Sequence, residues 1–458
     1  MLAALLMVAA LPDWAPARWS SNDPSSLSLL QGTPVNCLLM EQKLWSGPFV
    51  KKAAERNVAV LGLLHPGGDT AQSVRTAREQ GLQGVVLEGD FAGPDADAAR
   101  KSASSANLAL VELPSRRDVR FGSGSPILGS YQGVFPGILP VDEKDKAHAM
   151  PSGGPWIDTN AGFLRYARAL HKGEFWVAVK PPENQVLKVD RYLQAIGDAA
   201  MLGARWVVSL DNDFTRRLLA GDPKAVADWK KIGQYMRFYE DLKGYRDLPA
   251  YGKLAVLQDA SSGALLSGGV LDMIAVKHTP VRPVPGSILS AATLDRASMA
   301  VNVDPESLTP AEKEVLKEFT RHGGTVLNGP PGWKMPSADG NRITMDKDDV
   351  AKLDEIWKEV NTMIDRRNLG VRLFNVSSML SYLQAARDGK VAVLHLLNFS
   401  DYPVENVTAH VLGKFRKAWL LTPEGGKKAL EPYEVEEGPA TGLDIDLVRV
   451  AAAVVLEQ

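Results

Sequence analysis

Two apolar runs of the chain end in pairs of carboxylates spaced two residues apart. The run GVVLEGD ends with Glu88 and Asp90, and the run RWVVSLDND ends with Asp211 and Asp213. Residues two apart in an extended strand point to the same side, so both members of a pair can face one site. Hydrolysis of a glycosidic bond requires one carboxyl group that donates a proton and a second that attacks the anomeric carbon or activates water. We therefore predict Asp211 and Glu88 as the main catalytic pair and Asp90 as a further catalytic candidate.

Two glutamates stand at equivalent positions in other runs. Glu41 ends the run NCLLME, and Glu112 ends the run LALVE. Several carboxylates around one site raise the pKa of one of them by like-charge repulsion, which suits a general acid. We predict Glu112 as a catalytic candidate, and Glu41 and Asp213 as substrate-binding residues. Capping of the following helix, or pairing with Lys or Arg, is the structural alternative for each of these carboxylates.

Aromatic side chains near the same strand ends suit a sugar ligand, because aromatic faces stack on the C–H faces of pyranose rings. Sealing of the top of the domain by these rings is the structural alternative. Lys180 follows the run FWVAV and can bind a hydroxyl or a carboxylate, whereas Asp158 is either a ligand contact or a helix N-cap. The predicted substrate-binding aromatic residues are Trp45, Phe91, Tyr131 and Trp156.

Six short apolar runs carry most of these residues. Continuous apolar runs are typical of strands buried on both faces of a parallel sheet, whose carboxyl ends carry the ligand sites of barrels and open sheets. Helical segments alternate with the runs, which predicts an α/β fold with a (β/α)8 TIM-type barrel and Lys253 to Asp259 as its eighth strand. An open doubly wound sheet is the alternative. The runs are Asn36 to Glu41, Val58 to His65, Gly84 to Asp90, Leu108 to Glu112, Phe175 to Lys180 and Arg205 to Asp213, with Ile127 to Gly133 as a weaker strand.

The rest of the chain predicts two further domains. A strand at Met299 to Asp304, a capping box at Thr309 to Glu312 and a strand at Thr325 to Asn328 indicate a flavodoxin-like α/β domain. Pro280 to Pro285 is a rigid linker or an edge strand. Short runs with turns between them after Gly370 indicate a small C-terminal antiparallel β-sandwich. The expected parts are a signal-like segment at 1–25, the barrel at 26–252, the flavodoxin-like domain at 253–368, whose first strand is also the candidate eighth barrel strand, and the sandwich at 369–458.

Composition narrows the classes of function. The 458 residues include 52 Lys and Arg against 54 Asp and Glu, a net charge of -2, so no basic field is present to hold a nucleic acid. The sequence has neither paired CxxC nor Cys2His2 spacing, and we predict no metal site and no cofactor. The single Cys37 lies inside an apolar run and is predicted to be a small core residue rather than a nucleophile.

The N-terminus resembles part of an export signal. Met1 to Leu11 is almost wholly apolar, and small-x-small patterns end at Ala10 and at Ala17. The run is too short to span a bilayer, so we expect no membrane span. Because a basic n-region is missing, a frayed tail or a packed helix is the alternative. We expect a periplasmic or secreted protein, which the single Cys and the lack of a disulfide framework also fit.

The order of barrel, flavodoxin-like domain and β-sandwich resembles the family 42 β-galactosidases and related clans. The local match is Met299 to Trp333, which is similar to their trimerisation domain and to class I glutamine amidotransferases. It consists of the strand MAVNVD, the helix start LTPAEKEVLKEF and the ending RHGGTVLNGPPGW. The resemblance implies a carbohydrate substrate and a homo-oligomer formed through this domain. The amidotransferase Cys has no counterpart here, so that activity is not implied.

The barrel departs from the catalytic pattern of that family. The family's acid/base Glu follows an Asn at the end of the fourth strand, where this chain has Val111-Glu112-Leu113, and its nucleophile Glu follows the seventh strand, where this chain has Asp211 and Asp213. We therefore expect an exported glycoside hydrolase-like enzyme acting on an oligosaccharide or glycoside, without the β-galactosidase specificity. The alternatives are a non-catalytic carbohydrate-binding or assembly protein on the same scaffold, and a metal-dependent carboxylate enzyme.

Overall fold

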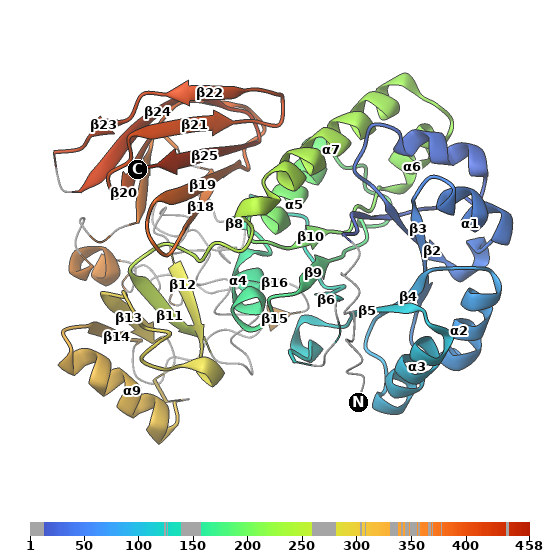
Figure 1. Cartoon of the computed structure of the whole chain (residues 1–458), viewed down its shortest axis with the longest axis horizontal. Helices are drawn as coiled ribbons and strands as arrows, with labels where there is room; N and C mark the ends of the chain where they lie inside the picture. Colours follow the sequence, from blue (N-terminus) through green and yellow to red (C-terminus); the bar gives the residue numbers. More distant parts are fainter. Residues whose placement is uncertain are drawn as a thin grey trace, which may run out of the picture.

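Eight parallel strands form a barrel in the first half of the computed structural model (Figure 1). Each strand pairs with the next one, and a parallel bridge between Ala17 and Val208 spans the remaining gap. The Arg18 amide donates a hydrogen bond of 2.8 Å to the Val208 carbonyl there. In sheet order the strands are β1 (Pro16–Arg18), β2 (Cys37–Glu41), β3 (Ala59–Leu64), β4 (Gly84–Glu88), β5 (Ala109–Leu113), β6 (Ile127–Ser130), β9 (Glu174–Val177) and β10 (Arg205–Trp206).

The structure describes most of the chain from residue 13 onward. Trp156 and the apolar run from Met1 to Leu11 lie outside the described residues. Residues 13–458 are described except for 123, 124, 126, 139–156, 259–280, 303, 304, 307, 330–337, 340, 341, 344–347, 349–354, 356, 357, 365–367, 369, 377, 437 and 438.

Two strands differ from the prediction. β1 lies inside the segment at 1–25 that we expected to be signal-like, and it takes one of the eight places in the barrel. β11 (Leu254–Gln258), the expected eighth barrel strand, belongs to a different sheet. A three-residue strand that contains a proline gives no apolar run. Conversely, a buried parallel strand such as β11 has the same apolar pattern whichever sheet it joins.

Helices cover the outside of the barrel. In the described part of the chain, only the short turn η3 (Arg116–Asp118) stands between β5 and β6. The helices are α1 (Gly47–Ala54), α2 (Thr70–Glu79), α3 (Gly93–Ala106), α4 (Ala161–Leu170), α5 (Val189–Ala200), α6 (Asn212–Leu219) and α7 (Pro223–Asp241), with turns η1 (Pro24–Leu30), η2 (Gln42–Leu44), η4 (Lys243–Tyr245) and η5 (Gly286–Ile288). Three of the helices, α2, α6 and α7, begin with an aspartate cap; in α2 the Asp69 carboxylate accepts the Gln72 amide at 2.9 Å. Within the described chain, every helix is too short or too polar to cross a lipid bilayer.

A second parallel sheet follows the barrel. Its order is β12 (Val281–Pro285), β11, β13 (Met299–Asn302) and β14 (Thr325–Asn328), with α9 (Pro310–Arg321) between β13 and β14. The predicted capping box is present, because Thr309 and Glu312 exchange side-chain and backbone hydrogen bonds. The proline-rich β12 is an edge strand, as one of the two expectations had it. The flavodoxin-like assignment of this unit stays a prediction.

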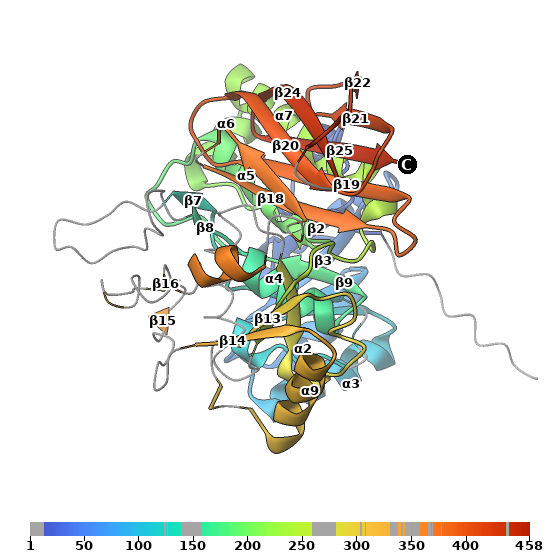
Figure 2. The same cartoon turned by 90° about the vertical axis from the view of Figure 1, so that its left-hand side faces the viewer.

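The C-terminal part consists of two antiparallel sheets that share one apolar core (Figure 2). Leu394 of the second sheet lies in the same buried cluster as Val407 and Leu443 of the first. The first sheet contains β17 (Val371–Phe374), β20 (Val404–Leu412), β24 (Ala440–Val448) and β23 (Tyr433–Glu434), and the second contains β18 (Met379–Ala385), β19 (Val391–Asn398), β25 (Ala451–Glu457), β21 (Lys417–Leu421) and β22 (Lys427–Leu430). Short pairs elsewhere are β7 (Gly137–Ile138) with β8 (Ile157–Asp158) and β15 (Ala338–Asp339) with β16 (Arg342–Ile343).

Alternation along the barrel strands separates an inner core from an outer one. Leu39, Leu63 and Val86 belong to a cluster that fills the barrel, whereas their strand neighbours, such as Val85, pack under the surrounding helices. Cys37 is fully buried in the inner cluster, where burial raises the pKa of its thiol. The predicted structural role of this cysteine is therefore confirmed.

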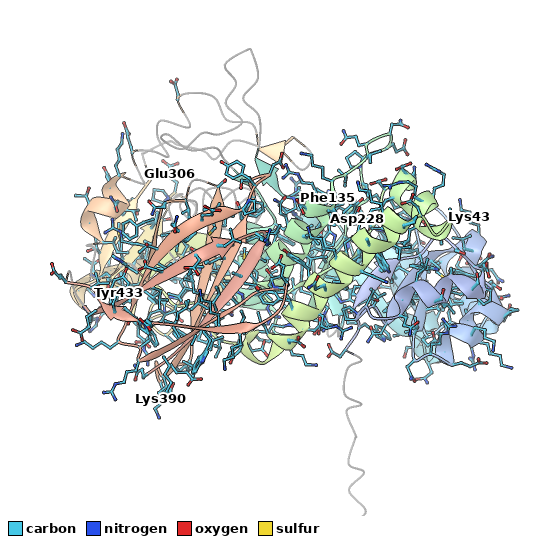
Figure 3. The ribbon with its side chains drawn as sticks, turned by 90° about the horizontal axis from the view of Figure 1, so that it is seen from above. Lys43, Phe135, Asp228, Glu306, Lys390 and Tyr433 are labelled. Atoms are coloured by element: carbon cyan, nitrogen blue, oxygen red, sulfur yellow. The ribbon has the colours of Figure 1, made fainter. Side chains whose placement is uncertain are left out.

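The sandwich packs against the helices of the barrel, and α7 lies between the sandwich and the first barrel elements (Figure 3). Leu397 of β19 approaches α5 so closely that a Cβ on Gly197 would lie 2.6 Å from its methyl carbon. His395 of the same strand stacks on Tyr239 of α7, with ring centroids 6.5 Å apart. The Nδ1 atom of His395 has no hydrogen-bond partner among the described residues. Burial lowers the pKa of His395 to about 4.

We predict that His395 makes this interface sensitive to acid. The folded-state pKa of about 4 lies below the ordinary histidine pKa of 6.5, so the unfolded chain binds more protons between these two pH values. The His395 contribution is fully present above pH 6.5 and is lost as the pH falls toward 4, a change on the order of 3 kcal/mol in the free energy of unfolding. Chemical denaturation at pH 7 and at pH 4.5 measures this change in the free energy of unfolding.

His395→Phe is expected to lose less stability between these two pH values than the wild type, because it keeps the apolar contact and removes the titrating group. His322→Gln is the control, since the His322 side chain is 75% exposed. An equal loss of stability in wild type and His395→Phe would contradict this account of the interface.

Candidate active site

Polar side chains gather at the carboxyl ends of the barrel strands and continue the inward face of the strands. Glu41 follows Leu39 at the end of β2, and Glu88 follows Val86 at the end of β4. His65 comes after β3 in the same alternation. Arg18 ends β1, while Lys180 and Ser209 come shortly after β9 and β10. We call these six residues, Arg18, Glu41, His65, Glu88, Lys180 and Ser209, the mouth cluster.

A buried ion pair joins two strands of the mouth cluster. Arg18 contacts both carboxylate oxygens of Glu88 through its two Nη atoms, one contact being 3.1 Å long. The side chains are only 12% and 7% exposed. Arg18 also donates from Nε to the Ser209 hydroxyl at 2.9 Å. Two-point Arg–carboxylate contacts restrict both partners, so Glu88 has a fixed position.

Glu41 is the more accessible carboxylate. Its Oε2 lies 2.9 Å from His65 Nε2 and its Oε1 lies 3.4 Å from Lys180 Nζ. Its side chain is 35% exposed, and those of His65 and Lys180 are 41% and 58% exposed. The hydrogen bond from His65 lowers the pKa of Glu41 to about 2. The same hydrogen bond raises the pKa of His65.

Cations separate the two carboxylates of the cluster. Lys180 Nζ is 3.4 Å from Glu41 Oε1 and 3.9 Å from Glu88 Oε2, so these oxygens lie no more than about 7 Å apart. His65 Nδ1 is 3.8 Å from Glu88 Oε2. We expected repulsion between carboxylates to raise the pKa of one of them, but the pKa of Glu41 is lowered. The reason is that His65, and after it Lys180, lie beside Glu41 and favour its charged form.

Asp211 has a different setting from the one predicted. It caps α6 by accepting the Phe214 amide at 2.8 Å, and it also accepts the Leu187 amide at 3.1 Å and the Tyr192 hydroxyl at 2.8 Å. Asp211 is 2% exposed. Within the described residues it makes no hydrogen bond or ion pair to the mouth cluster, so the structure does not bring together the predicted pair Asp211 and Glu88. The geometry of Asp211 is that of a structural cap.

Two other predicted acids point away from the mouth. Asp213 pairs with Arg216 and Arg217 on the surface of α6, at 2.6 and 2.8 Å. Glu112 forms a two-point contact with Arg100 of α3 at 3.0 and 2.7 Å. Because Val111 and Leu113 face the inside of the barrel, Glu112 between them faces outward. The expectation that these two acids line the mouth was therefore wrong.

The predicted aromatic residues divide between the two sides of the barrel. Tyr131 packs on the inner cluster and donates to Asp90 Oδ2 at 3.2 Å, so this pair lies beside the mouth cluster. Trp45 packs over the outer face of β3, where a Cβ on Gly62 would lie 2.3 Å from its ring. Phe91 also packs on the outer core. Neither ring therefore lies at the mouth cluster, where the sequence placed the sugar platforms.

Two predicted site residues carry no side-chain geometry here. Trp156 lies outside the described residues, and Asp158 is described only as the backbone of β8, which pairs with β7. In contrast, Arg18, His65 and Ser209 belong to the mouth cluster although the sequence analysis did not select them. Arg18 and Ser209 alternate with inward residues at strand ends, as Glu41 and Glu88 do, and this pattern is the signal that could have found them.

Among the described residues, no three or more His, Cys, Asp or Glu side chains are grouped so as to hold a metal ion. The cations nearest to the acids of the mouth cluster are instead supplied by the chain itself, as Arg18, Lys180 and the imidazole of His65. The cluster can therefore hold anionic and hydroxylated groups and can transfer protons through His65.

Two solved structures share this fold over most of the chain. The α-L-fucosidase isoenzyme 2 from Paenibacillus thiaminolyticus matches with a TM-score of 0.64 over 97% of this chain and 98% of its own, at 11% sequence identity. A rhamnosidase from Novosphingobium sp. PP1Y matches with a TM-score of 0.50 over 90% of this chain and 47% of its own, at 12% identity. This chain therefore spans about half the length of the rhamnosidase. At these identities the likeness shows a fold shared with glycoside hydrolases.

Comparison by sequence adds no relative. No protein-family model matches the chain, and no curated protein matches it significantly. The likeness to the two glycoside hydrolases is therefore a likeness of structure, and the reaction has to be argued from the mouth cluster itself.

We predict that Glu41 controls the titration of His65. Glu41→Gln removes the main group that raises the pKa of His65, so this pKa should fall. An NMR titration of the imidazole resonances against pH measures the pKa of His65. Asp213→Asn, which changes a carboxylate on the surface of α6, should leave the His65 pKa unchanged. If the pKa of His65 were the same in wild type and Glu41→Gln, the claim that Glu41 raises it would be wrong.

A second prediction concerns the structural role of Asp211. Asp211→Ala should lower the free energy of unfolding by about 2–4 kcal/mol, because it removes a helix cap and leaves the buried Tyr192 hydroxyl and Leu187 amide without an acceptor. Denaturant unfolding measures this change. Asp213→Ala, on the exposed side of the same helix, should have little effect. If both variants were equally stable, Asp211 would have to be free for another role.

Proposed function

We propose that the protein is a glycoside hydrolase whose active site is the mouth cluster. The observation that carries the proposal is the meeting of Glu41 and Glu88, from two different strands, around His65 and Lys180 at the carboxyl end of the barrel. Sites at this end of parallel barrels are the rule for enzymes of this fold. Support also comes from the fold that the chain shares with a fucosidase and a rhamnosidase.

Within this proposal, Glu41 is the carboxylate that faces the anomeric carbon. It is accessible, and a pKa of about 2 keeps it ionised at neutral pH. An anion at this position stabilises the positive charge that develops on the sugar ring as the glycosidic bond breaks. The oxygens of Glu88 are held by Arg18, so Glu88 acts as a positioning residue that keeps His65 and Lys180 near Glu41.

The proton for the leaving oxygen comes from His65. Its raised pKa keeps the imidazolium form present at a higher pH than an ordinary histidine. Nε2 is bonded to Glu41 at 2.9 Å, and Nδ1 makes a longer contact of 3.4 Å with the backbone carbonyl of Glu88. The proton on Nδ1 is therefore the one that a leaving oxygen can take, by replacing this longer contact. The bond between the anomeric carbon and the leaving oxygen breaks, and the oxygen takes this proton. Water then supplies the hydroxyl of the released sugar and the proton that returns to the site.

A non-catalytic carbohydrate-binding protein is the second candidate, and one observation favours it. Both carboxylates of the cluster are engaged with cations, and Glu88 contacts Arg18 through both oxygens. In such a site the charged groups bind sugar hydroxyls without turnover. Both candidates predict that the protein binds a sugar, but only the hydrolase predicts that a glycosidic bond is cleaved.

The proposal includes three further expectations. The flavodoxin-like identity of the β11–β14 unit and a homo-oligomer through it follow from the resemblance to family 42 β-galactosidases. Export to the periplasm or the medium follows from the apolar start of the chain. Signal cleavage after Ala10 would leave β1 intact, whereas cleavage after Ala17 would remove most of β1, so the first site is the one consistent with the barrel.

The test is hydrolysis of a panel of nitrophenyl glycosides that includes α-L-fucoside and α-L-rhamnoside. Wild type should cleave at least one of them, and Glu41→Gln should lower kcat by about a thousandfold while the fold is retained. The rate should fall at alkaline pH as His65 loses its proton, and Asp213→Asn should leave the rate unchanged. Sugar binding with no hydrolysis of any glycoside would favour the second candidate and contradict the hydrolase.

A further inference from the structure

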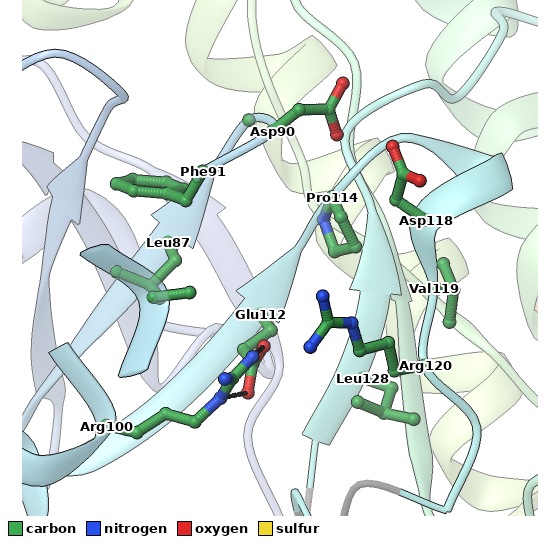
Figure 4. Close-up of a pocket in the computed structure, with 12 residues that line it drawn as sticks. Leu87, Asp90, Phe91, Arg100, Glu112, Pro114, Asp118, Val119, Arg120 and Leu128 are labelled. Atoms are coloured by element: carbon green, nitrogen blue, oxygen red, sulfur yellow. Dashed lines mark hydrogen bonds and ion pairs between the residues drawn. The ribbon is translucent and has the colours of Figure 1, made fainter. Parts of the chain in front are cut away.

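A separate pocket lies on the outer side of the barrel, beside the ends of β4, β5 and β6 (Figure 4). Its volume is about 220 Å³. Helix α3 bounds it on one side through Ala96 and Arg100. In the described chain η3 alone follows β5, so no helix fills the space that a full βα unit would fill. We call this cavity the outer pocket.

The floor of the outer pocket consists of two leucines and one ion pair, so it is electrically neutral. Leu87, Glu112 and Leu128 are neighbours across β4, β5 and β6 and face the same side of the sheet. The Glu112 carboxylate is fully engaged by Arg100 in the two-point contact described above. Phe91 adds an aromatic wall (Figure 4).

The upper edge of the pocket carries two carboxylates held by one serine. The Ser115 amide donates to Asp90 Oδ1 at 2.7 Å, and the Ser115 hydroxyl donates to Asp118 Oδ2 at 2.8 Å. Neither carboxylate forms an ion pair with a cationic side chain that the structure describes. Asp90 and Asp118 therefore keep free acceptor positions beside each other.

Arg120 provides donors on the opposite side. Its guanidinium points into the pocket toward Glu112 and Pro114 (Figure 4). Within the described chain it makes no ion pair, so its N–H groups are available. The charged groups of the pocket without an ion-pair partner in the described chain are thus Asp90, Asp118 and Arg120, which together carry a net negative charge. This balance disfavours an anionic ligand, whereas hydroxyl groups satisfy both kinds of side chain because each hydroxyl donates and accepts.

The outer pocket is connected to the mouth cluster through Asp90. This residue follows Glu88 by two positions, and its second oxygen accepts the Tyr131 hydroxyl at 3.2 Å. Tyr131 packs on the inner cluster, so one carboxylate touches both the barrel interior and the outer pocket. Gly89 between the two acids has φ +123°, a conformation that only glycine adopts readily and that turns the chain from one site toward the other.

We infer that the outer pocket binds a second, uncharged sugar residue of the glycan whose scissile bond lies at the mouth. A hydroxyl-rich ring fits a cavity of this size with one aromatic wall and polar groups on two opposite sides. The inference rests on the proposed function and narrows its substrate class to neutral oligosaccharides of at least two residues. Arg120 and Asp118 then determine specificity for the second residue.

The test measures binding of fluorescently labelled neutral mono-, di- and trisaccharides to the full chain. Wild type should bind di- or trisaccharides more tightly than the monosaccharide. Arg120→Met should weaken this binding about tenfold, because a hydrogen bond to a charged group is lost. Arg117→Met is the matched control, since Arg117 is an exposed residue of η3 that does not line the pocket. Asp118→Asn should also weaken oligosaccharide binding.

Equal affinity of wild type and Arg120→Met for every saccharide bound, or no binding of any saccharide, would overturn the inference. Failure of the proposed function is recognised separately. In that case no nitrophenyl glycoside is cleaved, while oligosaccharide binding still depends on Arg120. If glycosides are cleaved and oligosaccharide binding does not depend on Arg120, only the inference fails.

Discussion

The buried ion pair between Arg18 and Glu88 is the interaction on which the barrel mouth depends. It joins β1 to β4, and the contact from Arg18 to Ser209 adds the segment that follows β10. Removal of the Glu88 carboxylate would leave the Arg18 guanidinium buried without an anionic partner, at a cost of about 3–5 kcal/mol. The pair also neutralises Glu88, so the remaining cations, Lys180 and His65, can keep the accessible Glu41 ionised. The Arg18–Glu88 ion pair therefore both joins strands of the barrel and sets the charge balance around Glu41.

Much of the fold could be predicted from the sequence, because apolar runs and helix caps are local signals. The barrel strands β2 to β6, β9 and β10, the capping box at Thr309 and the two-sheet C-terminal part all follow from such signals. β1 could not be found in this way. Its three residues gain their stability from pairing with β2 and Val208, which lie far along the chain. For the same reason the sequence could not show which sheet β11 joins.

The site was predictable only in part, because an acid at the end of a strand can point either into the barrel or toward the surrounding helices. Glu41 and Glu88 continue the inward alternation of their strands, whereas Glu112 is one position out of step and pairs with Arg100. Asp211 ends an apolar run as the others do, but α6 begins directly after it and uses its carboxylate as a cap. Counting parity from the buried residues of each strand would have separated Glu112 from Glu41 and Glu88. It would not have separated Asp211, which has the same parity as Val207 and Ser209, so only the helix that begins after it distinguishes this residue.

Our central proposal is that a sugar binds for reaction at the mouth cluster. The chain shares its fold with a fucosidase and a rhamnosidase, and Asp90, which lines the outer pocket, follows Glu88 of the mouth cluster by two positions. The most direct measurement is a crystal structure of the protein soaked with a neutral oligosaccharide. We expect a sugar ring in contact with Glu41 and His65, with the next residue directed toward Asp90. A saccharide bound elsewhere, with Glu41 still enclosed by His65 and Lys180, would contradict the claim.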